Sequence, residues 1–180
     1  RHLFITRRRL PEPTFEMHAL LRQFLLSRAP EVLDRGALAA GMSRAARQLE
    51  ARGDGAAALA LRVEMGDLQE AERTVIAFAD AWLEQGRHRT IRDAIASLPP
   101  SLVVASAALS MYAGLGAMPF DQQEARRLLG DAFRGFGSAD DLAGRVRSAC
   151  GVVDTYAGNF SDFGSIAAWL DTLCALIDDA

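Results

Sequence analysis

The chain has 180 residues, half of them hydrophobic, with a formal charge of −3 and no lysine among its basic residues. No apolar run approaches the roughly 20 residues that a membrane-spanning helix needs, so the sequence predicts no membrane segment. The negative charge disfavours broad affinity for nucleic acid or anionic membranes, and the lack of lysine excludes a Schiff-base or phosphate-loop lysine from this stretch.

The first predicted elements are two short strands, a tight turn at Leu10-Pro11-Glu12-Pro13 and a helix, together spanning residues 3–28. No later segment has the alternation of a strand. Because a lone β-hairpin is marginal in water and the chain starts in mid-strand, we interpret it as a piece of a larger protein. Residues 1–30 would end one small domain, and residues 31–180 would form a helical domain.

After residue 30 the expected helix ends and starts are regularly spaced. Glycines at the expected ends are Gly53, Gly66, Gly86, Gly116, Gly137 and Gly158. Polar residues at the expected starts are Asp54, Asp67, Ser101, Asp121, Ser138 and Ser161. Glu70 and Glu124 follow their aspartates at the spacing of a capping box.

Apolar periodicity marks the faces of four helices. Three amphipathic stripes are Ala71, Val75, Phe78, Ala79, Trp82 and Leu83; Ala125, Leu128, Leu129, Ala132, Phe133 and Phe136; and Phe163, Ile166, Ala167, Leu170, Leu173, Cys174 and Ile177. The segment 102–113 is apolar nearly all round, which predicts one helix between neighbours.

Helix pairs are expected to begin near Asp67, Ser101 and Ser138, which are 34 and 37 residues apart. The tripeptide Tyr-Ala-Gly at 112–114 also recurs at 156–158. Repeats of this length are typical of α-solenoids. The predicted fold class is therefore all-α, an α-solenoid of tetratricopeptide-like helix pairs with a short N-terminal β-hairpin and helix.

The N-terminal motif carries a family resemblance. The stretches Leu3-Phe4-Ile5-x-Arg7 and Phe15-x-x-His18-x-Leu20-Leu21-x-x-Phe24-Leu25, followed by segments 45–53, 57–67, 83–87 and 98–99, resemble the ATP-dependent LuxR-type transcriptional activators related to the maltose-regulon activator. The resemblance covers roughly residues 3–136. It implies the end of a winged-helix domain joined to a superhelical region that senses an inducer or a regulatory protein.

The resemblance also implies ATPase and DNA-binding domains. Since neither a phosphate-loop motif nor a helix-turn-helix is found in this stretch, these would be neighbouring domains. No catalytic constellation is visible either, so we expect no enzyme activity, cofactor or metal here. The charged N-terminus has no export signal, and Cys150 and Cys174 lack Cys-x-x-Cys spacing, which favours the cytoplasm. Both cysteines are expected to be buried as small hydrophobes.

Two aromatic residues are the candidate ligand-binding residues, Tyr112 and Tyr156, because each is expected near a helix end where its hydroxyl reaches solvent. Trp82 and Trp169 could line the same groove or belong to the core. Arg7, Arg8 and Arg9 could touch DNA phosphates as a wing, but a solvated hairpin or an edge packed on the ATPase module is favoured. His18 is expected to cap or pack the strand–helix junction.

Two functions from different classes remain open. The first is the regulatory region of a bacterial activator, in which a small-molecule inducer or a regulatory protein shifts a conformational equilibrium. The alternative is a tetratricopeptide-like protein–protein interaction scaffold. Direct DNA binding through the hairpin arginines ranks last, so we expect no nucleic-acid or membrane partner for this stretch.

Overall fold

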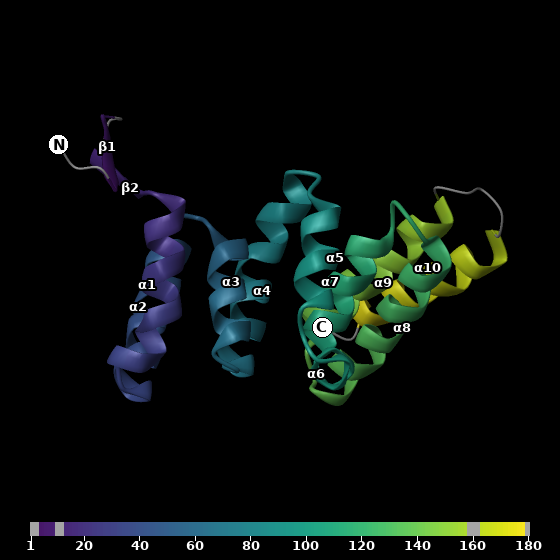
Figure 1. Cartoon of the computed structure of the whole chain (residues 1–180). Coiled ribbons are helices and arrows are strands. Elements are labelled where there is room, and N and C mark those ends of the chain that lie inside the picture. Colours follow the sequence, from purple (N-terminus) through teal and green to yellow (C-terminus); the bar gives the residue numbers. More distant parts are fainter. Residues whose placement is uncertain (1–3, 10–12, 158–162, 179–180) are drawn as a thin grey trace. The chain divides into compact units, whose positions relative to one another are not determined.

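The computed structural model describes residues 4–9, 13–157 and 163–178. Within this part the fold is all-α: two five-residue strands come first along the chain, and ten helices follow them (Figure 1). The chain divides into two compact units, Arg1–Ala45 and Ala46–Ala180. None of the described helices combines the length and the apolar character needed to cross a membrane.

The first unit begins with two antiparallel strands, β1 (Ile5–Arg9) and β2 (Pro13–Met17), in which Ile5 lies opposite Met17. Helix α1 (Ala19–Val32) follows at once. His18 caps it: Nδ1 of His18 accepts the N–H of Leu20 at 3.2 Å, which confirms the capping role predicted for this residue. The side chains of residues 7–16, and with them the three-arginine run, lie outside the described part.

Helix α2 (Arg35–Ala51) contains the division between the two units. The sequence placed a domain boundary after residue 30, a position that lies inside α1. A helix running across a boundary gives no composition shift, because its residues follow the helical pattern on both sides. The assignment of residues 1–30 to a winged-helix domain stays a prediction.

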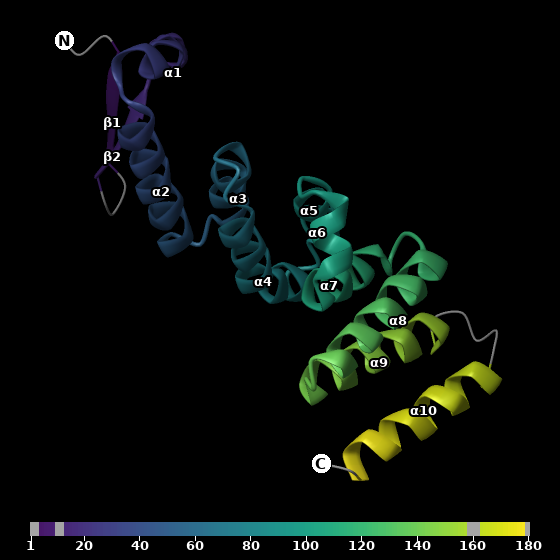
Figure 2. The same ribbon diagram turned by 90° about the horizontal axis from the view of Figure 1, so that it is seen from below.

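The second unit is a series of helices that pack mostly on helices close to them along the chain. After the end of α2 they are α3 (Gly55–Glu64), α4 (Leu68–Glu84), α5 (His88–Ala96), α6 (Pro100–Ala105), α7 (Ala107–Ala117), α8 (Gln122–Ser138), α9 (Leu142–Ala157) and α10 (Phe163–Asp178). Helices α8 and α9 lie side by side in both views (Figures 1 and 2).

Three glycines end helices as predicted. Gly53, Gly66 and Gly86 have φ of +79°, +71° and +67°, the left-handed region that glycine reaches without strain. In each case the next residue donates its N–H to the carbonyl five positions earlier, as in a Schellman motif. These bonds are Asp54 to Leu49 at 2.9 Å, Asp67 to Arg62 at 3.0 Å and Arg87 to Trp82 at 2.8 Å.

The predicted aspartate caps are also present. Asp54, Asp67 and Asp121 accept the backbone N–H three residues later, at 3.2, 3.4 and 2.9 Å. A helix start leaves backbone N–H groups without partners, so a carboxylate at this position satisfies one of them. Helices α3, α4 and α8 therefore begin where the sequence places them.

Other predicted boundaries are wrong. Gly116 lies inside α7, where an added Cβ would meet Cγ2 of Ile91 at 2.9 Å, so this glycine permits close packing on α5. Gly137 and Ser138 belong to the last turn of α8, and Ser101 lies inside α6. Gly158 and Ser161 lie outside the described residues.

The single helix predicted over 102–113 is also wrong, because the segment is broken into α6 and α7 at Ser106. Ser106 is extended (φ −103°, ψ 113°), and its side chain accepts the N–H of Leu109 at 3.2 Å. A serine cap inside an apolar run starts a new helix that hydropathy alone does not reveal.

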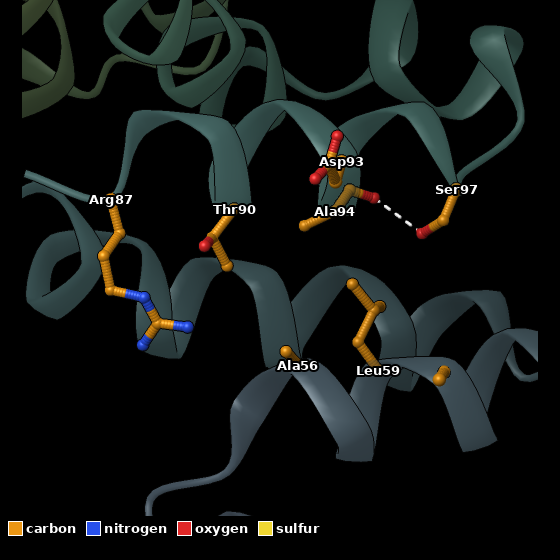
Figure 3. A pocket seen from close by; sticks show the side chains of 8 residues that line it. Ala56, Leu59, Arg87, Thr90, Asp93, Ala94 and Ser97 are labelled. Carbon is orange, nitrogen blue, oxygen red and sulfur yellow. Dashed lines mark hydrogen bonds between the residues drawn. The ribbon is translucent and has the colours of Figure 1, made fainter.

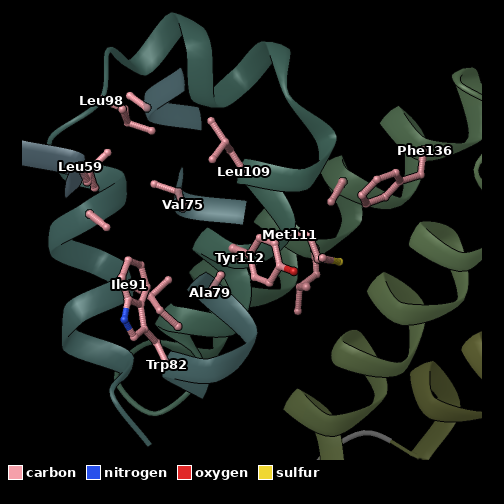
Figure 4. Close-up of a cluster of buried hydrophobic side chains, with 14 of the residues drawn as sticks. Leu59, Val75, Ala79, Trp82, Ile91, Leu98, Leu109, Met111, Tyr112 and Phe136 are labelled. Atoms are coloured by element: carbon pink, nitrogen blue, oxygen red, sulfur yellow. The ribbon is translucent and has the colours of Figure 1, made fainter. Parts of the chain in front are cut away.

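A hydrophobic core runs through the second unit from α3 to α9 (Figure 4). It confirms the predicted stripes of α4 and α8, and it includes the buried side chains Leu59, Val75, Trp82, Ile91, Leu109, Leu129 and Val152. The third stripe is wrong in part: Leu173 is buried, but Leu170 and Ile177 are 47% and 65% exposed. Helix α10 packs mainly on α9, and Trp169 also contacts Phe133 of α8, while the side of α10 that carries Leu170 and Ile177 stays exposed.

Candidate functional site

The two candidate tyrosines occupy different environments. Tyr112 lies in the middle of α7 and is buried, so the expectation that it stands near a helix end is wrong. Tyr156 lies near the end of α9 and is half-buried. Neither is among the residues that line the clefts described below. A ligand contact by either tyrosine stays a proposal.

Tyr112 belongs to a polar cluster that joins three helices. Nη1 of Arg147, on α9, donates to the hydroxyl of Tyr112 at 3.3 Å, and its guanidinium lies 5.2 Å from the ring centroid. The same guanidinium forms an ion pair with Asp80 of α4. Its hydrogen bond lowers the pKa of Asp80, while burial raises the pKa of Tyr112. These contacts give Tyr112 a structural role in holding α4, α7 and α9 together.

The ring of Tyr156 is covered by the side chain of an arginine from the neighbouring helix α8. The guanidinium of Arg126, on α8, lies 4.6 Å from the ring centroid. Its Nη1 also donates to the carbonyl of Thr155 at 3.4 Å. The ring therefore contacts a cation in the structure as it stands, and a ligand would need to displace or share that contact.

Two clefts border helix α5. The first, the α3–α5 cleft, has a volume of about 350 Å³ and is lined by Ala56, Leu59, Ala60, Arg87, Thr90, Asp93, Ala94 and Ser97. Figure 3 shows Arg87, the residue just before α5, and Thr90 of α5 extending toward the α3 side of this space. The hydroxyl of Ser97 donates to the carbonyl of Ala94 at 2.7 Å, so it is already partnered.

The second, the α5–α8 cleft, lies on the other side of α5. An apolar part of about 280 Å³ is lined by Arg92, Ile95, Ala96, Ala113, Ala117, Phe120, Asp121, Glu124 and Leu128. A more polar part of about 440 Å³ is lined by Arg89, Arg92, Asp93, Ala96 and Phe120. The two parts share three residues, so they form one cleft with an apolar and a charged end.

Phe120 lines both ends of this cleft. It is 47% exposed, and the guanidinium carbons of Arg89 and Arg92 lie 6.0 and 4.8 Å from its ring centroid. Within the described residues, neither arginine forms an ion pair with a carboxylate. An exposed aromatic ring with two unpaired guanidiniums is a surface suited to an anion with an apolar portion.

Sequence reasoning missed this site. It did not use the three-residue spacing of Arg89 and Arg92, which places both on one face of a helix. Phe120 lies 28 positions after Arg92 and joins them only through tertiary packing. No sequence signal available in a single chain connects the three.

Other predicted candidates have structural explanations. Trp82 is buried and stacks on Phe78, and Trp169 packs edge-on against Phe133, which is consistent with core roles. The prediction of buried cysteines is wrong: Cys150 and Cys174 are both exposed, because their positions face away from the packed sides of α9 and α10. The described residues contain no cluster that could hold a metal ion.

Comparison with protein-family models, with curated proteins and with solved structures found no match for this chain. The candidate site therefore has to be interpreted from its own geometry and charge.

Proposed function

We propose that this chain is the sensing region of a bacterial ATP-dependent transcriptional activator of the LuxR type related to the maltose-regulon activator. The observation that carries the sensing role is the α5–α8 cleft, where an exposed aromatic ring and two unpaired arginines border an apolar space. The family assignment rests on the resemblance of residues 3–28 and the helices that follow them.

The fold proposal is an α-solenoid of tetratricopeptide-like helix pairs. It is supported by the packing of α3 through α10 on helices close to them along the chain and by four connectors that share one design. Solenoids present extended surfaces built from successive helices, and α3, α5 and α8 contribute to such a surface through the two clefts.

The proposed mechanism is a shift in a conformational equilibrium. A ligand bound beside α5 would contact helices on both sides of it and would favour whichever arrangement it binds better. In the intact activator, neighbouring ATPase and DNA-binding domains in the cytoplasm would respond to that shift. This stretch would supply binding energy and no catalysis.

A second candidate function is a protein–protein interaction scaffold. The observation that favours it is that the clefts on either side of α5 share Asp93, so one surface continues from α3 to α8. An extended peptide could follow such a surface, as peptides do on other solenoids.

A thermal-shift screen against sugars, amino acids, aromatic acids and nucleotides tests the sensing function. A ligand at 100 times its Kd stabilises the folded state by about 2.7 kcal/mol, which raises the midpoint by several degrees. Tyr112→Phe and Tyr156→Phe remove only the hydroxyls, so a shift that either variant abolishes would place that tyrosine at the site.

Two results would count against the proposal. A flat screen on a folded sample, combined with capture of a defined peptide, would favour the scaffold. A full-length protein without an adjacent nucleotide-binding module would contradict the family assignment.

A further inference from the structure

The apolar end of the α5–α8 cleft has the size of a small-molecule site. Its volume of about 280 Å³ is just below the range of about 300–1,000 Å³ that such sites occupy, and the charged end adds further space to the same cleft. Ala113 and Ala117 of α7 form part of its lining, with Ile95 and Leu128 from the flanking helices. Alanine side chains leave the space open, and the larger aliphatic side chains give it apolar walls.

The charged end offers two cations that form no ion pair with any carboxylate among the described residues. Arg89 and Arg92 both lie over the ring of Phe120, and Asp93 is the one carboxylate that lines this end. Its lining therefore has a net positive charge in a chain that is negative overall. A guanidinium restrained against an aromatic face keeps its planar fork available for a carboxylate.

Carboxylates at the apolar end already have partners. The side chain of Asp121 accepts the N–H of Glu124 at 2.9 Å, and Nη2 of Arg127 pairs with Glu124 at 2.7 Å. That hydrogen bond lowers the pKa of Glu124, so the group is ionised at neutral pH. The carboxylates here would repel an anion, and the arginines at the other end would attract it. The charged group of a bound ligand should therefore lie at the arginine end of the cleft.

We infer that the α5–α8 cleft binds a small amphipathic carboxylate. Its carboxylate pairs with Arg89 and Arg92, and its aromatic or aliphatic body packs against Phe120 and the apolar end. This inference rests on the proposed sensing function and specifies its ligand class. A small ligand fits better than a peptide, because the cationic and apolar groups adjoin within one cleft and share Arg92, Ala96 and Phe120.

The test uses a matched pair of probes, 4-phenylbutyrate and its neutral amide, titrated into the chain by calorimetry. The two differ in charge but hardly in shape. We expect the carboxylate to bind at least about tenfold more tightly, because it alone forms charge-assisted hydrogen bonds with the arginines. That preference should shrink as salt is raised, since the site is open to solvent.

Variants locate the site. Arg89→Met together with Arg92→Met keeps the aliphatic stems and removes both charges, so the preference for the carboxylate should disappear while the amide binds as before. Arg134→Met is the matched control: Arg134 lies on α8, its side chain is 73% exposed, and it pairs with Asp131 away from the cleft. It should leave both affinities unchanged. Circular dichroism establishes that each variant is folded.

Equal binding of acid and amide, or no binding of either, would overturn the inference. So would a loss of carboxylate binding in Arg134→Met equal to that in the double variant. If a sugar or nucleotide stabilises the chain while the carboxylate does not bind, this ligand class is wrong and the sensing function stands. Binding of an acidic peptide without binding of 4-phenylbutyrate would overturn the inference in favour of the scaffold.

Discussion

At the scale of single residues, arginine links helices that are distant in sequence. Arg147 pairs with Asp80, 67 positions earlier, and bonds to the hydroxyl of Tyr112 between them. Arg62 is buried and lies 3.6 to 3.8 Å from three carboxylates, those of Glu50, Asp67 and Glu70. Its delocalised, weakly hydrated charge suits such sites. The contacts of Arg62 link α2, α3 and α4, and those of Arg147 link α4, α7 and α9.

Replacing Asp80 with asparagine should remove a pH-dependent part of the stability. The hydrogen bond from Arg147 lowers the pKa of Asp80, so the ion pair stabilises the folded state above the unfolded pKa of about 3.9 and is lost as pH falls below it. Asp80→Asn should cost up to about 1 kcal/mol at pH 7, because the pair is partly exposed, and less at pH 2.5, because the ion pair is lost as pH falls through the lowered folded-state pKa of Asp80.

Urea unfolding of both proteins at the two pH values measures this difference. Asp171→Asn serves as a control, since Asp171 is exposed on α10 and makes no ion pair within the described residues. A gap between Asp80→Asn and the parent that stays constant with pH would show that the lost energy comes from packing and not from the ion pair.

At the scale of elements, four of the described connectors share one design, a left-handed residue followed by a residue that begins the next helix. The left-handed residue is Gly53, Gly66 or Gly86 in three of them. In the fourth it is Asp140, with φ of +56°, and Asp141 donates to the carbonyl of Phe136 at 2.9 Å. The same bond pattern therefore forms without glycine. Because the sequence analysis used glycines to mark helix ends, it placed the end of α8 at Gly137 and did not recognise Asp140 as the left-handed residue.

Asp140→Gly should stabilise the chain. A non-glycine residue in the left-handed region is strained, and glycine relieves that strain at the cost of some backbone entropy, for a net gain of about 0.5–1 kcal/mol. The neighbouring Ala139→Gly is the control: Ala139 has φ of −95°, so glycine there brings only the entropy cost. Chemical denaturation compares the two. If Asp140→Gly instead lowers the free energy of unfolding, the side chain of Asp140 stabilises the chain by more than its left-handed backbone conformation costs.

At the scale of the molecule, the second unit has one continuous core and not a separate core for each helix pair. Leu129 of α8 is fully buried between its neighbours: a Cβ added at Gly114 or Gly151 would come within 2.7 and 3.1 Å of its side chain. Trp82, at the other end of this core, lies on α4. Because the two helices share this cluster, a substitution that destabilises α8 should also destabilise α4.

Leu129→Ala, made in a Trp169→Phe background, tests this. Trp82 is then the remaining tryptophan, so its fluorescence reports on α4 alone. Removing a fully buried leucine should cost about 2–5 kcal/mol, and the fluorescence and circular dichroism midpoints should fall together. Trp169→Phe without the leucine change is the reference. An unchanged Trp82 midpoint would show that the helix pairs unfold independently, as in loosely coupled repeat arrays.

The local features of the fold could be predicted because their causes are local. Gly53, Gly66 and the aspartates that follow them mark helix ends through backbone geometry and hydrogen bonds that span a few residues. The stripes of α4 and α8 follow from helical periodicity. His18 was correctly placed as a cap for the same reason.

The sequence by itself thus determined a mainly helical chain, the helix ends at Gly53, Gly66 and Gly86 and the faces of its central helices, because these depend on neighbours within about one helical turn. The tertiary structure decided that Gly116 serves packing, that α10 leaves Leu170 exposed, and that Tyr112 lies beneath Arg147. It also decided that Phe120 meets Arg89 and Arg92. Such contacts join residues far apart in the chain, and only the packing of whole helices against one another fixes which of them meet.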